Sequence, residues 1–475
     1  MDVGAAFVAR IPMLRYVVAR NPELARQILV SNQENYCKSA EYDMMAVPFG
    51  QGLVTDTDEK RYQRNRRVVQ PLFARGTIER FAGPITAAAA TRILSVGTDG
   101  APLDIGPEMN RLTLDIVART MFGTDLSGPI SHIRLTNLLK FFGVGFATNV
   151  SRPLRAGSRL PIRAMRWLTW LTAPHIMIEL RRIERAVDTL IADHRAGRIG
   201  GSDNLLGLLM AARDPETGHA YTDTEIRDEL MTSIGAGMET SAAALIWTWT
   251  LLAQHPEARD RLHAELEEVL GGRTPGAADV DALVWTRAVL AESMRLYPPI
   301  IGLTRVATGP DVLAGYRITA GTTVVISLHG VHHNATVWHA PERFDPTRHL
   351  SENMTTERRH GSLAFSAGRR VCIAQNFAVM ELVLSLAVLA QRLTLDSAGD
   401  AGTDPAGSVV HGWTPVLLVR VQQCEGETFP VLCRARDSGG APEGRRHPLR
   451  AYQLFQWVSC SAGRRFAGRK SVPRV

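Results

Sequence analysis

The stretch from Phe365 to Glu381 carries a cysteine in a setting suited to binding a metal. Gly368 permits a tight turn that a Cβ would strain, and Arg369 and Arg370 place positive charge just before Cys372. The apolar residues that follow recur at helical spacing, so the cysteine should lie just before a helix N-terminus. Free N–H groups and the helix dipole there favour a thiolate over a thiol. Such a thiolate is a good axial ligand for a haem iron.

A cysteine in front of a helix is more often a small buried residue than a metal ligand. Here, however, Phe365, Gly368, Arg370 and Cys372 match the spacing Phe-x-x-Gly-x-Arg-x-Cys-x-Gly. This run resembles the haem-binding loop of the cytochrome P450 family of haem-thiolate monooxygenases. Ala374 departs from the final glycine of that pattern, although alanine is also small. The resemblance implies that Phe365, Arg370 and Cys372 bind haem b and that Cys372 ligates its iron.

A second chemical signal lies in a long helical pattern over residues 222–254. Gly235 and Gly237 interrupt it at a cost of about 1 kcal/mol each relative to alanine, which suggests close packing or local opening of the helix. The run resembles the P450 oxygen-activation motif Ala/Gly-Gly-x-Asp/Glu-Thr, which ends here in Glu239 and Thr240. Splitting O₂ needs protons delivered into a dry pocket, and a hydroxyl beside a carboxylate can relay them. The resemblance implies that Glu239 and Thr240 are catalytic.

Other residues resemble the family's contacts to the haem propionates. Tyr62 and Arg66 are four residues apart, so they share one face of a predicted helix, although arginine-rich helices are most often solvated surface. Arg66 matches the family arginine, whereas Tyr62 stands where Trp or His is usual. Arg305 resembles the second propionate-binding arginine by its position after an apolar run. His332 contacts a propionate or caps a turn; its neighbour His333 also suggests a metal site, but the sequence offers no third ligand nearby.

Glu292 and Arg295 form a pair at i, i+3 spacing on a predicted helix. Such a pair is normally surface decoration. Here it resembles the family's Glu-x-x-Arg pair, which joins a further arginine and locks the core behind the haem. The expected third member is Arg343, in the run Pro-Glu-Arg-Phe. All three residues are predicted to be structural.

The resemblance covers roughly residues 13–421 and implies a mostly α-helical fold with small β-sheets. The haem should lie between the helix that contains Thr240 and the helix that follows Cys372. Residues 1–421 are expected to form the haem domain, with a shortened N-terminus, a loop over 39–58 and a terminal hairpin near 411–421. Residues 422–475 are expected to form a basic, disordered tail, with an interaction tail or a non-native extension as alternatives.

The bulk composition restricts the partners of this 475-residue chain. Its net charge of +7 comes from the tail, because residues 431–475 carry a net +8 and leave −1 for residues 1–430. This balance does not favour nucleic-acid binding by the body. Five sparse cysteines without CxxC spacing fit a reducing cytoplasm. The sequence shows no apolar run long enough to span a membrane and no export leader, so a cytoplasmic location is expected.

The resemblance implies insertion of one oxygen atom from O₂ into a hydrophobic organic substrate, by hydroxylation or epoxidation. No glycine-rich flavin or nicotinamide fingerprint follows a strand, so electrons should come from a ferredoxin or flavodoxin with its reductase. Arg369 is a candidate contact for that partner. The alternatives are a peroxide-driven haem-thiolate peroxygenase and a non-catalytic haem-thiolate sensor; Glu239 beside Thr240 argues against both.

Residues 135–185 combine several tryptophans and phenylalanines with arginines. In the family this region covers the substrate pocket. The segment also fits core helices with a basic solvated face, or peripheral contact with a membrane.

Overall fold

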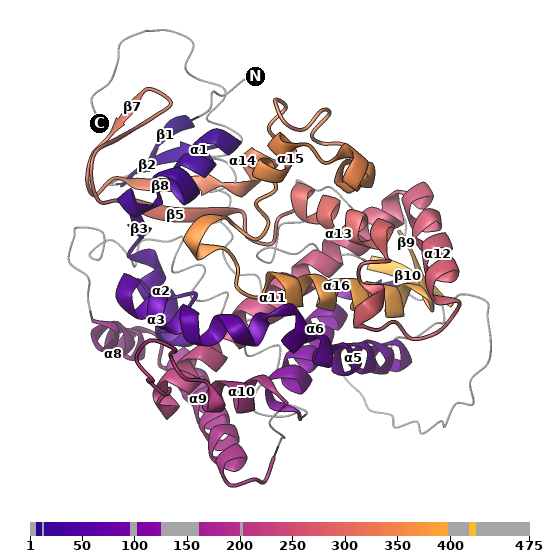
Figure 1. The fold of residues 1–475 in the computed structure, drawn as a ribbon, viewed down its shortest axis with the longest axis horizontal. Coiled ribbons are helices and arrows are strands. Elements are labelled where there is room, and N and C mark those ends of the chain that lie inside the picture. The colour runs from indigo at the N-terminus through magenta and orange to yellow at the C-terminus, as the bar shows by residue number, and fades with distance from the viewer. Residues whose placement is uncertain are drawn as a thin grey trace.

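The structure is a computed structural model that describes residues 6–11, 14–95, 102–124, 161–199, 203–397 and 418–423. Helices form most of the described chain, and small sheets lie at its margins (Figure 1). The helices are α1 (Pro22–Arg26), α2 (Glu41–Phe49), α3 (Glu59–Val69), α4 (Arg75–Ile78), α5 (Ala82–Ser95), α6 (Ile105–Phe122), α8 (Ile162–Thr172), α9 (Pro174–Arg195), α10 (Leu205–Ala211), α11 (Asp223–Gln254), α12 (Pro256–Leu270), α13 (Val284–Leu296), α14 (Leu328–His332), α15 (Thr356–Gly361) and α16 (Gln375–Ala390).

The strands form three sheets, and the largest of them brings two cations together. The strands are β1 (Ala6–Ile11), β2 (Leu14–Ala19), β3 (Tyr36–Lys38), β4 (Pro102–Asp104), β5 (Gly302–Ala307), β6 (Asp311–Leu313), β7 (Tyr316–Ile318), β8 (Thr323–Ser327), β9 (Leu393–Ser397) and β10 (Leu418–Gln423). The largest sheet has the order β1-β2-β8-β5-β3. Its edge strand β3 runs antiparallel to β5, and the register sets Lys38 opposite Arg305.

Helix α11 crosses the middle of the fold and sets the position of its neighbours (Figure 1). Its first turn is held by a capping box in which Thr222 and Glu225 satisfy each other's backbone N–H groups. Most of its residues are buried, with α6, α13 and α16 packed around it. A helix that is apolar on nearly all sides must lie in the interior. The helix predicted over 222–254 is therefore confirmed.

Residues 39–58 differ from the expected loop. A helix, α2, occupies Glu41–Phe49, even though Pro48 lies inside it. Burial of Met44, Val47 and Phe49 against the surrounding helices stabilises this segment where local propensity does not. The loop is thus restricted to the residues between α2 and α3.

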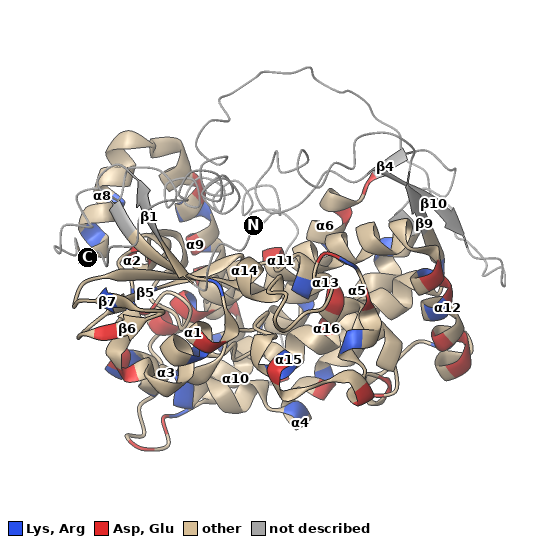
Figure 2. Ribbon diagram, turned by 90° about the horizontal axis from the view of Figure 1, so that it is seen from above, with Lys and Arg blue, Asp and Glu red and all other residues tan. Residues whose placement is uncertain are grey.

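The C-terminal part of the described chain pairs β10 with both β9 and β4. The expected hairpin partner of this strand, near residue 411, lies outside the described residues, as does the predicted tail beyond residue 423. In the parts of the chain that the structure describes, no helix is both long enough and apolar enough to cross a membrane. Acidic and basic residues are interspersed along outer helices such as α12, as expected for a body of nearly zero net charge (Figure 2).

Of the region 135–185, only α8 and α9 and the residues from 161 onward are described. Trp167 and Leu171 of α8 are 64% and 57% exposed, so this face of α8 is not part of the core. The guanidinium of Arg181 lies 4.8 Å from the ring centre of Trp170. Aromatic side chains beside arginines are typical of surfaces that contact a membrane interface. Peripheral membrane contact through this face stays a prediction.

Candidate active site

The loop before α16 places Cys372 through backbone hydrogen bonds. Gly368 has a φ of +70°, and a Cβ there would lie 1.8 Å from the carbonyl oxygen of Leu29, so only glycine fits. The N–H of Val371 donates to the carbonyl of Gly368 (3.0 Å), and the N–H of Cys372 donates to the carbonyl of Phe365 (2.9 Å). The Phe365 side chain packs against the central core. The predicted glycine turn is confirmed.

The protein around Cys372 raises the pKa of its thiol. Although the side chain reaches solvent in a cleft, desolvation by the surrounding protein outweighs the backbone N–H of Ala374 and the charge of Arg66, which both lower the pKa. The predicted bias toward a thiolate is therefore wrong for the protein by itself. Helix α16 begins at Gln375, so its dipole acts from further away than expected. A metal ion bound to the sulfur would supply the missing bias, because coordination deprotonates a thiol.

Helix α3 braces the cysteine loop through Tyr62 and Arg66. Arg66 Nη1 donates to the carbonyl of Val371 (3.0 Å), the residue before the cysteine, and to the hydroxyl of Tyr62 (2.7 Å). The Tyr62 hydroxyl in turn donates to the carbonyl of Arg369 (2.8 Å). The structure thus brings both predicted residues to the loop. Tyr62, which stands where the family usually has Trp or His, braces the loop through its hydroxyl.

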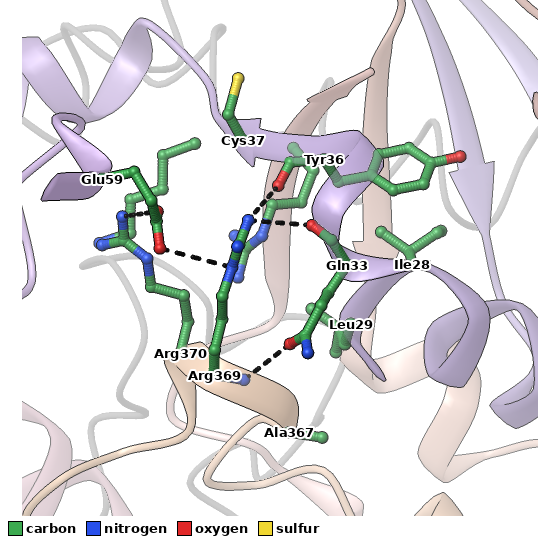
Figure 3. A pocket seen from close by; sticks show the side chains of 11 residues that line it. Ile28, Leu29, Gln33, Tyr36, Cys37, Glu59, Ala367, Arg369 and Arg370 are labelled. Carbon is green, nitrogen blue, oxygen red and sulfur yellow. Dashed lines mark hydrogen bonds and ion pairs between the residues drawn. The ribbon is translucent and has the colours of Figure 1, made fainter. Parts of the chain in front are cut away.

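Arg370 links the same loop to the start of α3. Its guanidinium lies 3.4 Å from the ring centre of Tyr62, a cation–π contact. It also donates to the carbonyl of Asp56 (3.0 Å) and to the carboxylate of Glu59 (2.7 Å). Figure 3 shows Arg370 and Arg369 projecting from the loop toward Glu59. Two arginines therefore enter one cleft, together with a single carboxylate that partly balances them.

Lys38 is a functional candidate that the sequence reasoning missed. It lines the same cleft as Arg305, Arg369 and Arg370, and it is buried, as is Arg305 opposite it. Burial, reinforced by Arg370 and Arg305, lowers the pKa of Lys38 well below its usual value. Like charges opposite each other on adjacent strands destabilise a sheet. The available signal was that Lys38 lies two residues after Tyr36 in a short strand, which places both side chains on the same face.

These cations test whether the residues present fit a haem. A haem carries two propionate carboxylates, and a buried group of cations is stabilised by such anions. Lys38 and Arg305 come from the sheet, Arg370 from the cysteine loop and Arg66 from α3. Cys372 lies in the same loop, next to Val371, whose carbonyl accepts from Arg66. The donor set therefore fits a haem with a thiolate ligand.

A cleft of about 560 Å³ borders Cys372 on another side. It is lined by residues of α3 and α16 and the segments beside them: Arg66, Arg67, Gln70, Pro71, Phe73, Ala74, Pro215, Val371, Cys372, Ile373, Gln375 and Asn376. Arg369, the expected contact for an electron donor, does not line it. Arg369 instead donates to the carbonyl of Gln33 (3.0 Å) and pairs with Glu34 (3.0 Å). Its charge is engaged within the chain.

The glycines of α11 have different roles. A Cβ at Gly235 would lie 2.3 Å from the ring of Phe49, so close packing explains this glycine. A Cβ at Gly237 would meet only Val117, at an ordinary 3.5 Å. The helix is continuous through both, so the local opening that the glycines suggested is not present. Thr240 Oγ1 donates to the carbonyl of Ala236 (2.6 Å), one turn earlier in its own helix. Thr240 and its neighbour Glu239 are partly buried.

Glu381 is a second candidate that the sequence reasoning missed. It is buried, and it accepts a hydrogen bond from the hydroxyl of Ser241 (2.8 Å), the residue after Thr240. Burial raises the pKa of Glu381 to about 8. This carboxyl therefore keeps a proton at neutral pH beside the predicted relay. The available signal was that Glu381 is the single charged residue in the apolar helix Gln375–Ala390. The pair joins α11 to α16, which also lie side by side in Figure 1.

His332 lies apart from the cations that line the cleft. Its Nε2 accepts the backbone N–H of Leu363 (3.0 Å), and its carbonyl accepts from Arg295 (2.8 Å). Burial, with the nearby charges of His333 and Arg295, lowers its pKa to about 3, so the ring is neutral. His332 therefore has a structural role, since its ring holds the backbone of Leu363, and contact with a propionate stays a prediction. Among the described residues, no cluster of three or more His, Cys, Asp or Glu side chains suits a metal ion.

A buried ion-pair network lies behind the site. Arg295 donates two hydrogen bonds to Glu292 (2.7 and 2.8 Å), and both side chains are almost fully buried. The third member is Arg348, whose Nε lies 3.3 Å from Glu292 Oε1, and His349 also contacts that carboxylate (2.9 Å). The prediction for Arg343 is wrong, because its side chain is exposed and only its carbonyl reaches Arg295. Arg343 and Arg348 lie in one short segment, and the sequence alone did not show which of them reaches Glu292.

Residues 3–410 match the family model described as Cytochrome P450. This chain belongs to the cytochrome P450 family. The P450 is 35% identical over 373 residues to "Cyclooctatin synthase" of Streptomyces melanosporofaciens, covering 78% of this chain and 79% of that protein. It is 34% identical over 396 residues to "Cyclooctat-9-en-7-ol 5-monooxygenase" of the same organism, covering 82% and 83%. It is 32% identical over 400 residues to "Pentalenene oxygenase" of Streptomyces avermitilis, covering 82% and 84%.

A solved structure confirms the fold of this P450. The crystal structure of the cytochrome P450DA heme domain superposes with a TM-score of 0.77 at 24% identity, covering 88% of this chain and 90% of that one. The predicted mostly helical fold with small sheets is therefore confirmed. The P450 is a haem-dependent monooxygenase that inserts one oxygen atom from O₂ into a hydrophobic substrate, with electrons supplied by redox partner proteins.

Proposed function

We propose that this P450 oxygenates a terpenoid or a similar hydrophobic molecule, by hydroxylation or epoxidation, with haem b as its cofactor. The observation that carries the site assignment is the convergence on the cysteine loop of Arg66 from α3 and of the buried cations Lys38 of β3 and Arg305 of β5. The names of two relatives, a 5-monooxygenase of cyclooctat-9-en-7-ol and an oxygenase of pentalenene, support the substrate class.

In this proposal each side chain has a defined role in holding the cofactor. Cys372 ligates the iron, and Phe365 packs beneath the loop that carries it. Tyr62 and Arg66 brace that loop and contribute to one propionate. The remaining propionate charge is neutralised by Arg305, Arg370 and Lys38. A haem bound in this way supplies the redox chemistry that divides O₂ and transfers one of its oxygen atoms to the substrate.

The protein's part in the reaction is to exclude water and to control protons. Thr240 holds its hydroxyl proton on the carbonyl of Ala236 and can turn that proton toward the reacting atoms. Glu239, the neighbouring carboxylate, exchanges protons with Thr240. Glu381 keeps a proton at neutral pH and lies one hydrogen bond from Ser241, so it can act as a buried reserve for the same turn. Electrons enter from a ferredoxin or a flavodoxin with its reductase, bound over the cleft that Cys372 borders.

A turnover assay tests this function directly. We expect the purified protein, supplied with O₂, NADPH, and a surrogate ferredoxin and ferredoxin reductase, to oxygenate a cyclic terpene hydrocarbon, and we expect little product from hydrogen peroxide alone. The expected difference between turnover with O₂ and turnover with peroxide follows from Glu239 and Thr240, because their protons are needed to process O₂ and not peroxide. Efficient turnover with peroxide alone would instead identify a peroxygenase. Failure to consume O₂ with any electron donor would favour the sensor.

The role of Lys38 can be tested through haem retention. We expect Lys38→Met to weaken haem binding by about 2 kcal/mol, or about 30-fold, because one charged hydrogen bond to a propionate is lost. Transfer of haem to apomyoglobin, followed by absorbance, measures the loss. Lys60→Met, which removes an exposed lysine from the first turns of α3, is the control and should not change haem transfer. Equal transfer rates in the two variants would exclude Lys38 from the propionate site.

We also propose that the protein is cytoplasmic and that its haem domain ends near residue 421. Cys37 and Cys372 are free thiols, which supports a reducing compartment. Strand β10 ends at Gln423, which supports a boundary close to residue 421. Fractionation of the source cells, followed by detection of the chain, tests the location.

A further inference from the structure

One short loop is attached to α11 at three successive points. Thr232 Oγ1 donates to the carbonyl of Phe49 (3.0 Å), the last residue of α2. The N–H of Gln51 donates to the carboxylate of Asp228 (2.9 Å), and the N–H of Leu53 donates to the carboxylate of Glu229 (3.1 Å). Side chains of one helix face thereby satisfy the carbonyl at the end of α2 and two N–H groups of the loop that follows it.

Glycines make this close approach possible. Gly50 has a φ of +69°, and a Cβ there would lie 2.3 Å from Asp228. A Cβ at Gly52 would lie 2.3 Å from the hydroxyl of Thr232. Because neither position tolerates a side chain, the loop over 49–53 and the helix face from Asp228 to Gly235 fit together in one arrangement.

The loop connects this helix face to the cleft lined by Lys38, Arg305, Arg369 and Arg370. Beyond the attachment to Glu229, the carbonyls of Leu53 (3.5 Å) and Val54 accept hydrogen bonds from Lys38 Nζ. At the other end, the ring of Phe49 packs on Gly235, four residues before Glu239. Movement of the loop is therefore coupled both to a proposed propionate ligand and to the turn of α11 that leads to the proton relay.

Glu229 is the member of this attachment whose pKa reaches neutral pH, although burial raises the pKa of Asp228 as well. It is buried, and the charges that act on it are the carboxylates of Asp228, on its own helix, and Asp56, on the loop. The phenol of Tyr221 also faces it from the segment before α11. Nearby cations are engaged elsewhere, since Arg61 pairs with Asp56 and Arg64 pairs with Glu225. Burial, with these two carboxylates, raises the pKa of Glu229 to about 7.

We propose that Asp228 and Glu229 form a latch that seats the loop 49–54 on α11, and that loss of the proton from Glu229 releases it. A neutral carboxyl accepts the Leu53 N–H in a dry site at little cost. An ionised carboxyl at the same place is buried beside two other carboxylates, so water entry and loop release are favoured. Glu229 is a positioning residue, and release of the loop frees Lys38 and opens the side of the cleft that Lys38 lines. This last step depends on the proposed haem site.

Hydrogen exchange tests the latch without reference to haem chemistry. We expect peptides covering 49–56 in the holoprotein to lose protection by about tenfold per pH unit as the pH rises from about 4.5 to about 7, after correction for the intrinsic exchange rate, and to change little above pH 7. The window lies between the ordinary pKa of a released Glu229 and the raised pKa of the seated one, because release is linked to loss of one proton. Glu229→Gln keeps an acceptor for Leu53 and should stay protected at every pH. Glu229→Leu removes that acceptor and should be weakly protected at every pH. Glu268→Gln, an exposed substitution on α12, should behave as the wild type.

A pH-independent wild type, or a Glu229→Gln variant that keeps the pH dependence, would overturn the latch. Stopped-flow binding of 4-phenylimidazole, read from the Soret band, tests the second step. We expect its association rate to rise with pH in the wild type and to be independent of pH in Glu229→Gln, after allowance for ionisation of the probe. A pH-dependent loop with no matching change in binding rate would show that the latch does not control the pocket. The CO-difference spectrum of each variant reports separately whether the haem site itself is intact.

Discussion

Replacing Cys372 by serine is expected to abolish the red-shifted Soret band of the reduced, CO-treated protein and to leave no detectable oxygenation. An alcohol cannot replace a thiolate as the donor of electron density that favours O–O cleavage. The loop itself should persist, because its hydrogen bonds involve the backbone of Phe365, Gly368, Val371 and Cys372 and not the sulfur. The difference spectrum and product formation measured on the same preparation check both parts of the result.

The chain contains a matched control for this substitution. Cys37 is the other described free cysteine; it lies on β3, and its sulfur is 3.6 Å from the carbonyl of Val306. In Figure 3 its sulfur points away from the arginines that enter the cleft. Cys37→Ser should keep the full Soret shift and near-normal turnover. A Cys372→Ser protein that still showed the thiolate band would remove Cys372 as the ligand and, with it, the proposed site.

Replacing Glu292 by glutamine is expected to destabilise the protein by about 3–5 kcal/mol. The substitution leaves the charges of Arg295 and Arg348 buried without their carboxylate, and an unpaired buried charge is costly. Urea denaturation followed by circular dichroism measures the change. Arg348→Gln should also be strongly destabilising, whereas Arg343→Gln, at an exposed position, should change stability by less than about 0.5 kcal/mol. The reverse order would restore Arg343 as the third member of the network.

Titration of the Glu292 carboxylate should also reduce the free energy of unfolding at low pH. Arg295 and His349 lower the pKa of Glu292 to about 2, despite the opposing effect of burial, whereas the unfolded chain should titrate near 4.5. A lowered folded-state pKa stabilises the protein above the unfolded pKa, and this stabilisation is lost as the pH falls from about 4.5 to about 2. Its full size is about 3 kcal/mol. The free energy of unfolding of Glu292→Gln should therefore change less between pH 5 and pH 3 than that of the wild type. Parallel urea titrations at the two pH values would detect the difference.

Short-range pattern accounts for the parts of the site that the sequence predicted well. The glycine turn before Cys372, the helix that carries Tyr62 and Arg66, and the long helix with Thr240 all follow from local backbone preference and apolar spacing. These features depend on residues within a few positions of one another. The family resemblance then supplied the roles, and membership of the family is confirmed.

Predictions failed where the outcome depended on residues far apart in the chain. Spacing pointed to Arg343, but the segment around it turns that side chain outward and sends Arg348 to Glu292. The expected thiolate bias at Cys372 failed because desolvation by the surrounding protein outweighs nearby N–H groups and charge. The loop expected over 39–58 became a helix because its apolar side chains are buried by other helices.

The sequence by itself determined the family, and with it the reaction class, and it predicted the helices that carry the candidate site, because motif spacing and amphipathic periodicity are local properties. Cys372 as the iron ligand stays a prediction. Only the tertiary structure decided which charges meet. Strand register set Lys38 against Arg305, helix packing buried Glu381 beneath Ser241, and the loop after α2 met Glu229. Each of these contacts joins segments more than 100 residues apart, and their energies depend on burial and on neighbouring charges that no local pattern encodes.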